Sequence, residues 1–505
     1  MKRILAVLLS LMMLGSLLSA TAVSEADDNT LRFGTDAEPI GFDPHTISAV
    51  ASLRVINQLY NTLIDVDEDL NVIPELAESW EQPDDVTYVF HLRDDVTFHN
   101  GRKMTAEDVK YSFERILTPD AGMLGNSASY AGNIDTVEAV DDYTVTLTLN
   151  SITAPFLASL SSSYCSIVCK EVVEEHGDLL RADAGTGPYT LGEWVPDNVV
   201  RLNKYDGYFL EGKPHLDMIE YYVMTDSAAR LAALRTGVVD VINADTAMLS
   251  LVTDDANINT LYYQTRNYVT LCLNVAAFEP FKDARVRQAV SLAINREEII
   301  DMAFNGEAEI SGFVPASMGR WAVDVSDHPL YQQNVNNAKA LMDEAGYTDG
   351  FEVELIVGLL DTLRDMGVVV QQQLAEIGVR VNVVNKENAE YVDLWGQHAF
   401  EMMACQNGAG SDPSRGVAFF FKTGNTANIA EYSNARVDEL CDLGAGTTDP
   451  DEREGYYKEA IEIILDECPN VTVCSPREYF LASPRLQGFT PSASTPYALI
   501  NARFE

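Results

Sequence analysis

The stretch 86–119 constrains the fold most, because a strand pattern in it gives way to a helical pattern. Residues 86–92 carry apolar side chains at every second position, which predicts a strand with one buried face. An Asn-Gly pair then predicts a turn, because both residues tolerate positive φ at little cost. Thr105, with Asp108 three residues later, predicts a capped helix start, and a proline ends the helix. The stretch therefore predicts a strand, a turn and a helix of an α/β protein.

The same stretch contains two adjoining motifs, L-R-D-x-V-x-F-H-x-G and M-T-A-E-D-V-K-Y-S-F-E-R. A second block, GTGPY at Gly185–Tyr189, precedes NKYDGYFLEGKPHLD, and a third block reads FKDARVRQAVSLAINREEII. Together and in this order, the blocks resemble the family 5 solute-binding proteins, which are extracytoplasmic receptors of peptide- and nickel-type ABC importers. The resemblance covers nearly the whole chain after its N-terminal apolar segment.

The length and charge of the chain limit its architecture and its partners. A chain of 505 residues is long for one hydrophobic core, so two or three lobes are expected. A hydrophobic content of 47% indicates a folded globular protein. The 77 acidic residues exceed the 34 Lys and Arg residues, which gives a formal net charge of −43. This charge repels phosphate groups and anionic lipids, so nucleic acid is not an expected partner.

The N-terminus has the pattern of an export signal. Lys2-Arg3 precedes an apolar run, Ile4–Leu18, and the small residues before and at Ala22 match a cleavage site. The run is shorter than the roughly 20 residues that span a bilayer. We therefore expect cleavage after Ala22 and an exported, periplasmic or otherwise extracytoplasmic protein associated with the cell surface. Retention of the segment as an anchor is the alternative. No cysteine lies near the cleavage site, so lipidation is not expected.

The fold expected from the pattern and from the resemblance is α/β with two lobes. Helices and strands alternate from Ala338 onward, which indicates an α/β lobe. The resemblance implies a periplasmic-binding-protein-like fold of type II, in the large peptide-binding subclass, with an inserted subdomain. The implied division is a signal peptide at 1–22, a first segment of lobe I at 23–75, the inserted subdomain at 76–184, a return to lobe I at 185–267, lobe II at 268–488, and a final return to lobe I at 489–505.

No catalytic or metal-binding motif stands out. The sequence has no G-x-S-x-G, no H-E-x-x-H and no paired-cysteine zinc spacing, and its seven histidines are scattered. The acidic run around Asp67 imitates a calcium loop, but Leu70 and Leu76 occupy the positions that require Gly and Glu. We therefore expect a binding protein rather than an enzyme, with no metal site and no cofactor.

Seven cysteines in an exported protein leave at least one unpaired. Cys272 and Cys405 lie in two strands that should be neighbours, which makes them one candidate disulfide pair. Cys468 with Cys474 is a second candidate pair. The simpler interpretation is that these residues are buried thiols, which pack as small hydrophobic side chains.

The resemblance implies a mechanism of binding rather than bond chemistry. A solute would bind between the lobes, hinge motion would close them, and the closed form of a monomeric receptor would dock on the permease subunits of an ABC importer, with the ATPase subunits engaged indirectly. The solute would be a peptide or a peptide-like molecule. The alternatives are a non-peptide solute, such as an oligosaccharide or metal chelate, and a secreted binding protein used in signalling. The candidate ligand-binding residues are Glu38, Pro39, Thr186, Gly187, Asn267, Tyr268, Asp361, Gln406, Asn407, Gly408, Ala409 and Asp412.

One part of the peptide-branch pattern is missing. Peptide-binding relatives place an Asp four residues before the proline of an acid-Pro pair, with a Trp three residues before that Asp. When the chain is aligned on Asp412-Pro413, Ala409 and Gln406 occupy these positions. Nickel-type relatives carry a His just after the proline, where this chain has a serine. We therefore expect weak binding of free di- and tripeptides, and a ligand whose cationic end is absent, blocked or held elsewhere, with Asp36 or Asp361 as substitutes.

Overall fold

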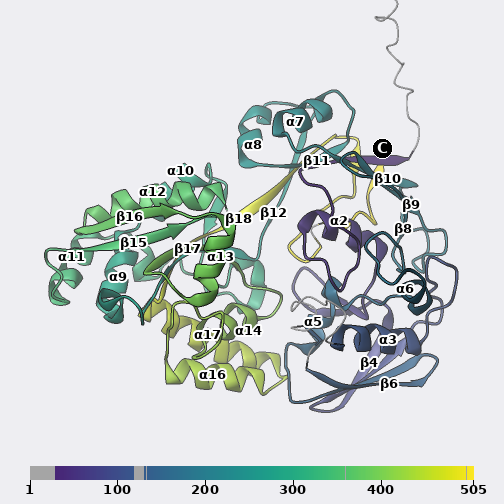
Figure 1. Cartoon of the computed structure of the whole chain (residues 1–505), viewed down its shortest axis with the longest axis horizontal. Coiled ribbons are helices and arrows are strands. Elements are labelled where there is room, and N and C mark those ends of the chain that lie inside the picture. Colours follow the sequence, from purple (N-terminus) through teal and green to yellow (C-terminus); the bar gives the residue numbers. More distant parts are fainter. Residues whose placement is uncertain (1–28, 119–129, 132, 359, 496) are drawn as a thin grey trace, which may run out of the picture.

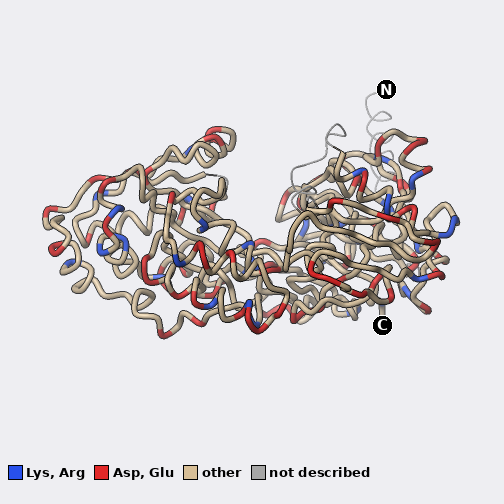
Figure 2. Tube along the Cα trace, turned by 90° about the horizontal axis from the view of Figure 1, so that it is seen from below, with Lys and Arg blue, Asp and Glu red and all other residues tan. Residues whose placement is uncertain are grey.

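A computed structural model describes residues 29–505, apart from 119–129, 132, 359 and 496. The chain forms two α/β lobes that are joined by a narrow waist (Figures 1 and 2). The predicted export signal and its cleavage after Ala22 lie outside the described residues. Within the described ranges, no helix has the length and apolar character needed to cross a membrane.

The first lobe is built on one half of a twelve-stranded sheet. Its first strand, β1, pairs in parallel with β10 and β11, and antiparallel strands continue the sheet in the order β10-β9-β8. Helix α2 packs beside this sheet, and its buried residues belong to the main hydrophobic core of the lobe. The elements are β1 (Thr30–Thr35), α2 (Val50–Leu59), β2 (Ile64–Val66), β3 (Val72–Pro74), β8 (Tyr189–Val195), β9 (Val199–Lys204), β10 (Met218–Val223), α7 (Ser227–Arg235), β11 (Val241–Ala244), α8 (Thr246–Val252), β19 (Leu486–Gln487) and β20 (Arg503–Phe504).

A four-stranded antiparallel sheet in the order β4-β5-β7-β6 forms the inserted part of this lobe. The predicted strand at 86–92 is confirmed as β5, and β6 and β7 form an antiparallel hairpin beside it. The elements are β4 (Ala77–Asp84), β5 (Thr87–Leu92), α3 (Ala106–Leu117), β6 (Ile134–Asp141), β7 (Thr144–Leu149), α5 (Phe156–Leu160), η1 (Ser163–Cys165) and α6 (Lys170–His176).

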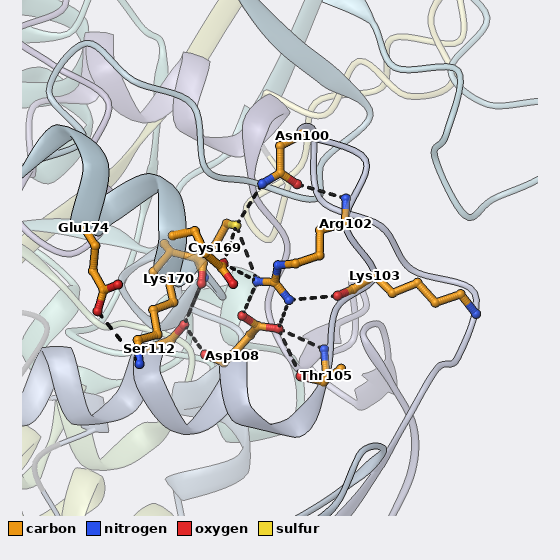
Figure 3. A network of polar contacts seen from close by, with 11 residues as sticks. Asn100, Arg102, Lys103, Thr105, Asp108, Ser112, Cys169, Lys170 and Glu174 are labelled. Atoms are coloured by element: carbon orange, nitrogen blue, oxygen red, sulfur yellow. Dashed lines mark hydrogen bonds and ion pairs between the residues drawn. The ribbon is translucent and has the colours of Figure 1, made fainter.

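Figure 3 shows how polar contacts fix the start of α3. The backbone N–H of Thr105 donates to Oδ2 of Asp108 over 2.9 Å, so the predicted cap is confirmed. Arg102 holds the same carboxylate through both of its terminal nitrogens and also pairs with Glu171 of α6 at 2.8 Å. Ser112, one turn farther along α3, accepts from the backbone N–H of Val168. The turn, the helix and the following segment are thus locked together, which explains why this stretch combines such regular patterns.

The second lobe carries the other half of the large sheet, in the order β16-β15-β17-β13. The alternation of helices and strands expected from Ala338 onward is confirmed by α11, β15, α12, β16, α13 and β17. The elements are β13 (Asn267–Leu273), η2 (Glu279–Lys282), α9 (Ala284–Ala293), α10 (Arg296–Ala303), β14 (Ala308–Ile310), η3 (Ala316–Trp321), η4 (Pro329–Tyr331), α11 (Val335–Glu344), β15 (Phe351–Val357), α12 (Asp361–Ala375), β16 (Val379–Asn385), α13 (Asn388–Gln397), β17 (Met402–Gly408), α14 (Pro413–Gly416), α15 (Ala418–Phe421), α16 (Ala435–Ala445) and α17 (Pro450–Glu467).

Two antiparallel strands connect the lobes, β12 (Asn259–Gln264) and β18 (Asn470–Ala482). The first part of β18 pairs with β13 in the second lobe, and its last part pairs with β11 in the first lobe (Figure 1). The chain therefore returns to the first lobe within β18, earlier than the expected boundary at 488. Side chains tie the crossing together: Gln264 donates to Ser475, and the Thr265 hydroxyl donates to the Pro476 carbonyl at 2.7 Å. This two-strand crossing connects the two lobes.

Candidate functional site

A cavity of about 440 Å³ lies where the crossing strand β18 meets the first lobe. The loop after β1, the start of α2, the end of β11 and the final segment of the chain surround it. Its chemically distinctive wall residues are Asp36, Glu38, Arg54, Glu478, Tyr479 and Tyr497. Residues far apart in sequence meet in this cavity, so a molecule bound here would contact both the first lobe and the strand β18 that crosses to the second lobe.

Two of the charged residues in the cavity wall, Arg54 and Asp36, form an ion pair with each other. Arg54 donates to Asp36 over 2.7 Å, and its guanidinium lies 5.4 Å from the centre of the Tyr497 ring. Burial alone would raise the pKa of Asp36, but the neighbouring Arg54 guanidinium holds that pKa below its ordinary value. The pair is therefore ionised at neutral pH and contributes no net charge to the cavity.

Two further carboxylates in the cavity have hydrogen bonds but no ion pair with any described residue. Glu38 accepts from the indole Nε1 of Trp194 at 2.7 Å and from the backbone N–H of Asp197 at 3.0 Å. Glu478 accepts from the Tyr263 hydroxyl at 2.7 Å. These neutral donors orient the carboxylates without cancelling their charge. The cavity wall is therefore acidic and suits a cationic or hydrogen-bond-donating group of a solute.

A buried network holds the loop that carries Glu38. Arg115 of α3 donates to both oxygens of Asp43, and its Nη1 lies 2.7 Å from Nδ1 of His45. The other ring nitrogen of His45 lies 2.9 Å from the carbonyl oxygen of Ser166. Burial and the positive charge of Arg115 lower the pKa of His45 to about 4. A neutral His45 fits this arrangement, with Nε2–H donating to Ser166 and Nδ1 accepting from Arg115.

The second lobe contributes the segment that follows β17. The backbone N–H of Ala409 donates to the Arg266 carbonyl over 2.8 Å, and Gly410 then turns the chain with a φ of +73°. Asp412 caps α14 by accepting from the Ser414 N–H, and its carboxylate pairs with Arg453 at 2.8 Å. Both members of that pair are largely buried. These contacts of Asp412 fix the position of the segment that follows β17.

Only some of the predicted ligand-binding residues lie in the cavity wall or at an exposed position. Glu38 lies in the cavity wall, and so does Asp36, which was named as a substitute acid. Among the others, Gln406 is exposed, and Asn267, Asn407 and Gly408 are partly exposed along the end of the β13–β17 pair. These residues stay candidates for contact with a solute.

Several predicted residues are not accessible. Ala409 and Tyr268 have no exposed surface, Pro39 is buried, and Asp412 is occupied by Arg453. The Ala409 methyl packs inward because the chain leaves β17 and turns over it. Thr186 donates to Oδ1 of Asn61, and a Cβ at Gly187 would lie 2.4 Å from a backbone oxygen of α2. In this structure these positions contact other parts of the chain.

Asp361 lies apart from the cavity. It is exposed at the first turn of α12, where it pairs with Arg364. Local reasoning missed Arg54, Glu478, Tyr479 and Tyr497, because they come from a helix, a long strand and the C-terminal segment that only the fold brings together. No short motif marks any of the four.

The expected Cys272–Cys405 disulfide is absent from the structure, where both residues are buried free thiols. The register explains this outcome: Cys405 lies opposite Thr270 and Cys272 lies opposite Met403, so the two cysteines are diagonal neighbours. A hydrogen bond between the thiols and burial raise the pKa of Cys272 well above its ordinary value. Cys468 and Cys474 are also free and buried. The interpretation as small hydrophobic side chains fits all four.

Among the described residues, no cluster of three or more His, Cys, Asp or Glu side chains could hold a metal ion. Asp67, in the acidic run that imitates a calcium loop, instead accepts from the backbone N–H groups of Asp69 and Asn71. This pattern is a tight turn between β2 and β3.

Comparison with known proteins gives consistent matches over most of the chain. The profile of "Bacterial extracellular solute-binding proteins, family 5 Middle" matches residues 71–428. Heme-binding protein A of Haemophilus influenzae is 28% identical, with 94% of this chain and 92% of the relative aligned. The dipeptide-binding protein of Escherichia coli K12 is 29% identical, with 91% of each chain aligned. The solved structure of the periplasmic binding protein AgaA of A. tumefaciens R10, in complex with agropinic acid, has a TM-score of 0.77 at 27% identity and covers 94% of this chain and 99% of that chain.

The ligands named for these three proteins are chemically different, although all three proteins match this chain at similar identity. Overall similarity therefore does not choose a ligand. The choice depends on the residues that line the space between the lobes.

Proposed function

The chain belongs to the bacterial extracellular solute-binding proteins of family 5, and from this premise we propose that it is the substrate-binding component of an ABC importer. In this role it captures a peptide or peptide-like small solute between its lobes and delivers it to a membrane permease. The proteins of this family are solute-binding proteins, so the proposed mechanism is binding and hinge closure without bond chemistry.

The observation that carries this proposal is the cavity of about 440 Å³ beside the two-strand crossing. A volume in this range holds a small solute. Tyr479 illustrates the coupling: it lines the cavity, lies on the crossing strand β18, and its hydroxyl contacts Glu307, just before β14. A solute seated against β18 can therefore favour one arrangement of the lobes over another.

The wall chemistry agrees with a solute that has donor groups and at least one polar end. Glu38 and Glu478 offer carboxylate oxygens that no described cation neutralises. Tyrosine rings at Tyr479 and Tyr497 supply flat apolar surface with hydroxyl groups at its edge. Peptides and related amides present this combination of donors and apolar side chains.

Delivery requires partners outside this chain. We propose that the protein acts as an exported monomer, that its signal segment is cleaved after Ala22 without lipidation, and that its closed form docks on the permease subunits. Support comes from the family description, which is of extracellular proteins, and from the export pattern in the sequence.

Native mass spectrometry of the purified protein tests the proposal directly, because a solute captured between closed lobes would appear as a mass increment. A mass increment that disappears on partial unfolding and dialysis is expected, and the released molecule is then identified. Small-angle scattering of the emptied protein should show a smaller radius of gyration when that molecule is added back.

Glu478→Gln serves as the test variant, because it removes a cavity charge while keeping the hydrogen-bonding shape. Glu352→Gln, at an exposed pair with Arg380 in the second lobe, is the matched control. Weakened retention in the first variant and wild-type retention in the second are expected. A solute that stabilises the protein without any change in radius of gyration would contradict capture between closing lobes.

A further inference from the structure

The β2–β3 hairpin of the first lobe ends in a tight turn outside the cavity. The two strands pair antiparallel as far as Val66 and Val72, so the turn spans 67–71. Its acidic sequence imitates a calcium loop, but Leu70 stands where such a loop requires Gly. An apolar side chain therefore lies at the tip of an otherwise polar turn.

Asp67 fixes the shape of this turn. Its carboxylate accepts from the backbone N–H groups of Asp69 at 3.0 Å and Asn71 at 2.8 Å, and from the Asn71 side chain at 3.0 Å. The backbone N–H of Leu70 donates to the Asp67 carbonyl over 3.1 Å. The donors of Asn71 hold the pKa of Asp67 below its ordinary value, so the carboxylate is ionised at neutral pH. The shape of the turn is thus set by contacts within it.

Leu70 has a backbone conformation that leucine rarely adopts. Its φ is +66°, in the left-handed region where a Cβ comes too close to the following carbonyl oxygen and where Gly or Asn is favoured. Glycine would give the same turn without this steric cost. The leucine side chain is therefore expected to make a contribution that glycine would not make.

The side chain of Leu70 packs on the second lobe. It is partly buried against a hydrophobic cluster whose buried residues all lie between Tyr268 and Leu465. The carbonyl oxygen of the preceding residue, Asp69, lies 4.0 Å from the position that a Cβ would take on Gly319 of η3. The hairpin belongs to the first lobe, but its tip contacts η3 and the hydrophobic cluster of the second.

The part of the second lobe that meets the hairpin is itself anchored. Ser317 of η3 donates to the carbonyl of Thr265, the residue that follows β12, over 2.7 Å. Arg320 of η3 pairs with Glu454 of α17 at 2.7 Å. Because η3 is tied both to the end of the crossing strand and to α17, a contact with η3 positions the second lobe as a whole.

A polar link accompanies the apolar contact. Ser494 of the C-terminal return donates to the Asp67 carbonyl over 2.9 Å and accepts from Nη2 of Arg266 at 2.6 Å. Arg266 lies between β12 and β13, where the chain enters the second lobe. The turn is thus connected to the second lobe through Ser494 as well as through Leu70.

We propose that the turn 67–71 is a brace between the lobes, a non-covalent connection that holds the second lobe at the angle to the first seen in this structure. Two paired strands, such as β12 and β18, can twist and bend together, whereas a contact at a third place restricts both motions. The inference goes beyond the proposed function, because it applies to the empty protein whatever solute binds. A brace also reduces the conformational freedom that the lobes lose when a solute binds between them.

Leu70→Gly is the first test variant, because glycine adopts a φ of +66° freely and keeps the turn while it deletes the side chain. In the protein emptied of solute, we expect the backbone amides of η3 to exchange with deuterium about 5- to 30-fold faster than in the wild type. Small-angle scattering of the same sample should show a larger radius of gyration, because the lobes then adopt a wider range of arrangements.

Three further variants separate the side chain from the turn. Leu70→Asn, which also tolerates the left-handed backbone, should behave like Leu70→Gly. Leu70→Met keeps an apolar side chain and should retain wild-type exchange and radius. Glu68→Gln, at an exposed position of the same turn, is the matched control and should leave both measurements unchanged.

Ser494→Ala tests the polar link without changing the hairpin. Ser494 is partly exposed, so this variant is expected to fold even if circular dichroism shows that Leu70→Gly does not. Exchange at η3 and the radius of gyration should change in the same direction as in Leu70→Gly, by a smaller factor.

Each contrary result has a distinct meaning. Faster exchange confined to the hairpin, with η3 and the radius unchanged, would assign Leu70 to the folding of the hairpin and overturn the proposal. Faster exchange at η3 without a larger radius would show a local contact that does not hold the lobes, and wild-type behaviour of Leu70→Gly, Leu70→Asn and Ser494→Ala would show no brace. Equal changes in Glu68→Gln would also contradict it. None of these measurements involves solute binding, so their failure leaves the receptor function standing.

Discussion

The two sides of the inter-lobe space differ in how their charges are satisfied. On the first-lobe side, Arg54 and Asp36 neutralise each other, and Glu38 and Glu478 accept from fixed protein donors. On the second-lobe side, Arg415 of α14 lies over the Phe419 ring and makes no ion pair with any described residue. The charged groups on the first-lobe side are therefore held by protein partners before any solute binds. On the second-lobe side, the N–H donors of Arg415 have no described acceptor. A hinged receptor gains from this division, because one lobe can bind first and the open donors of the other can then favour closure.

The largest effect on stability is expected at the buried Arg453–Asp412 ion pair of the second lobe. Arg453→Met should destabilise the protein by about 3–5 kcal/mol, because Asp412 would keep its charge in a buried position without its partner. Urea denaturation measures the loss. The double variant Arg453→Met with Asp412→Asn should recover part of it. A loss below about 1 kcal/mol would show that the turn carrying Arg415 is not held by this pair.

Acid should lower the free energy of unfolding through protonation of His45, which lies in the loop that carries Glu38. The pKa of His45 is about 4 in the folded protein and 6.5 as an unperturbed group, so the unfolded chain binds the extra proton between these values. Its contribution is thus present above pH 6.5 and is lost as the pH falls toward 4, by about 3 kcal/mol in total.

Urea denaturation at pH 7 and pH 4.5 measures this change, and the His45→Gln variant isolates it. Glutamine can accept from Arg115 and donate to Ser166, but it does not titrate. The variant should therefore lose less stability between the two pH values than the wild type does. Equal losses would show that His45 does not control the acid response of this loop.

Binding of the cognate solute should bring the two lobes together and raise the free energy of unfolding of the protein. At about 100 times its dissociation constant, a solute that binds only the folded protein adds roughly 2.7 kcal/mol. Thermal melts report the stabilisation, and scattering reports the compaction. In Glu478→Gln, addition of solute at the same concentration should give a smaller increase in melting temperature than in the wild type.

The smallest effect is expected at Asp361, which was a candidate from sequence. Asp361→Asn removes an exposed ion pair with Arg364, and such pairs contribute at most about 1 kcal/mol and commonly less than 0.5 kcal/mol. Solute affinity should be unchanged. A clear loss of affinity by calorimetry would place α12 at the binding site. The second-lobe side of the site would then include an acidic residue.

The sequence predicted elements well where the determining contacts are local. Asp108 caps the helix that begins beside Thr105, and the strand predicted at 86–92 forms as β5. These features depend on residues only a few positions apart, so their patterns are visible in the chain. The site was harder to predict: Glu38 lies in the cavity, but Ala409 is buried because the chain turns over it after Gly410.

By itself the sequence determined the family, the α/β character and the missing acid at Ala409, since motifs and alternation carry these properties residue by residue. Only the tertiary structure decided which charges have partners. Glu478 reaches the cavity because β18 crosses between the lobes, and Arg266 meets the turn before Arg415 because β13 pairs with β17. An ion pair depends on a separation of a few ångströms, and residues hundreds of positions apart reach that separation only through the fold.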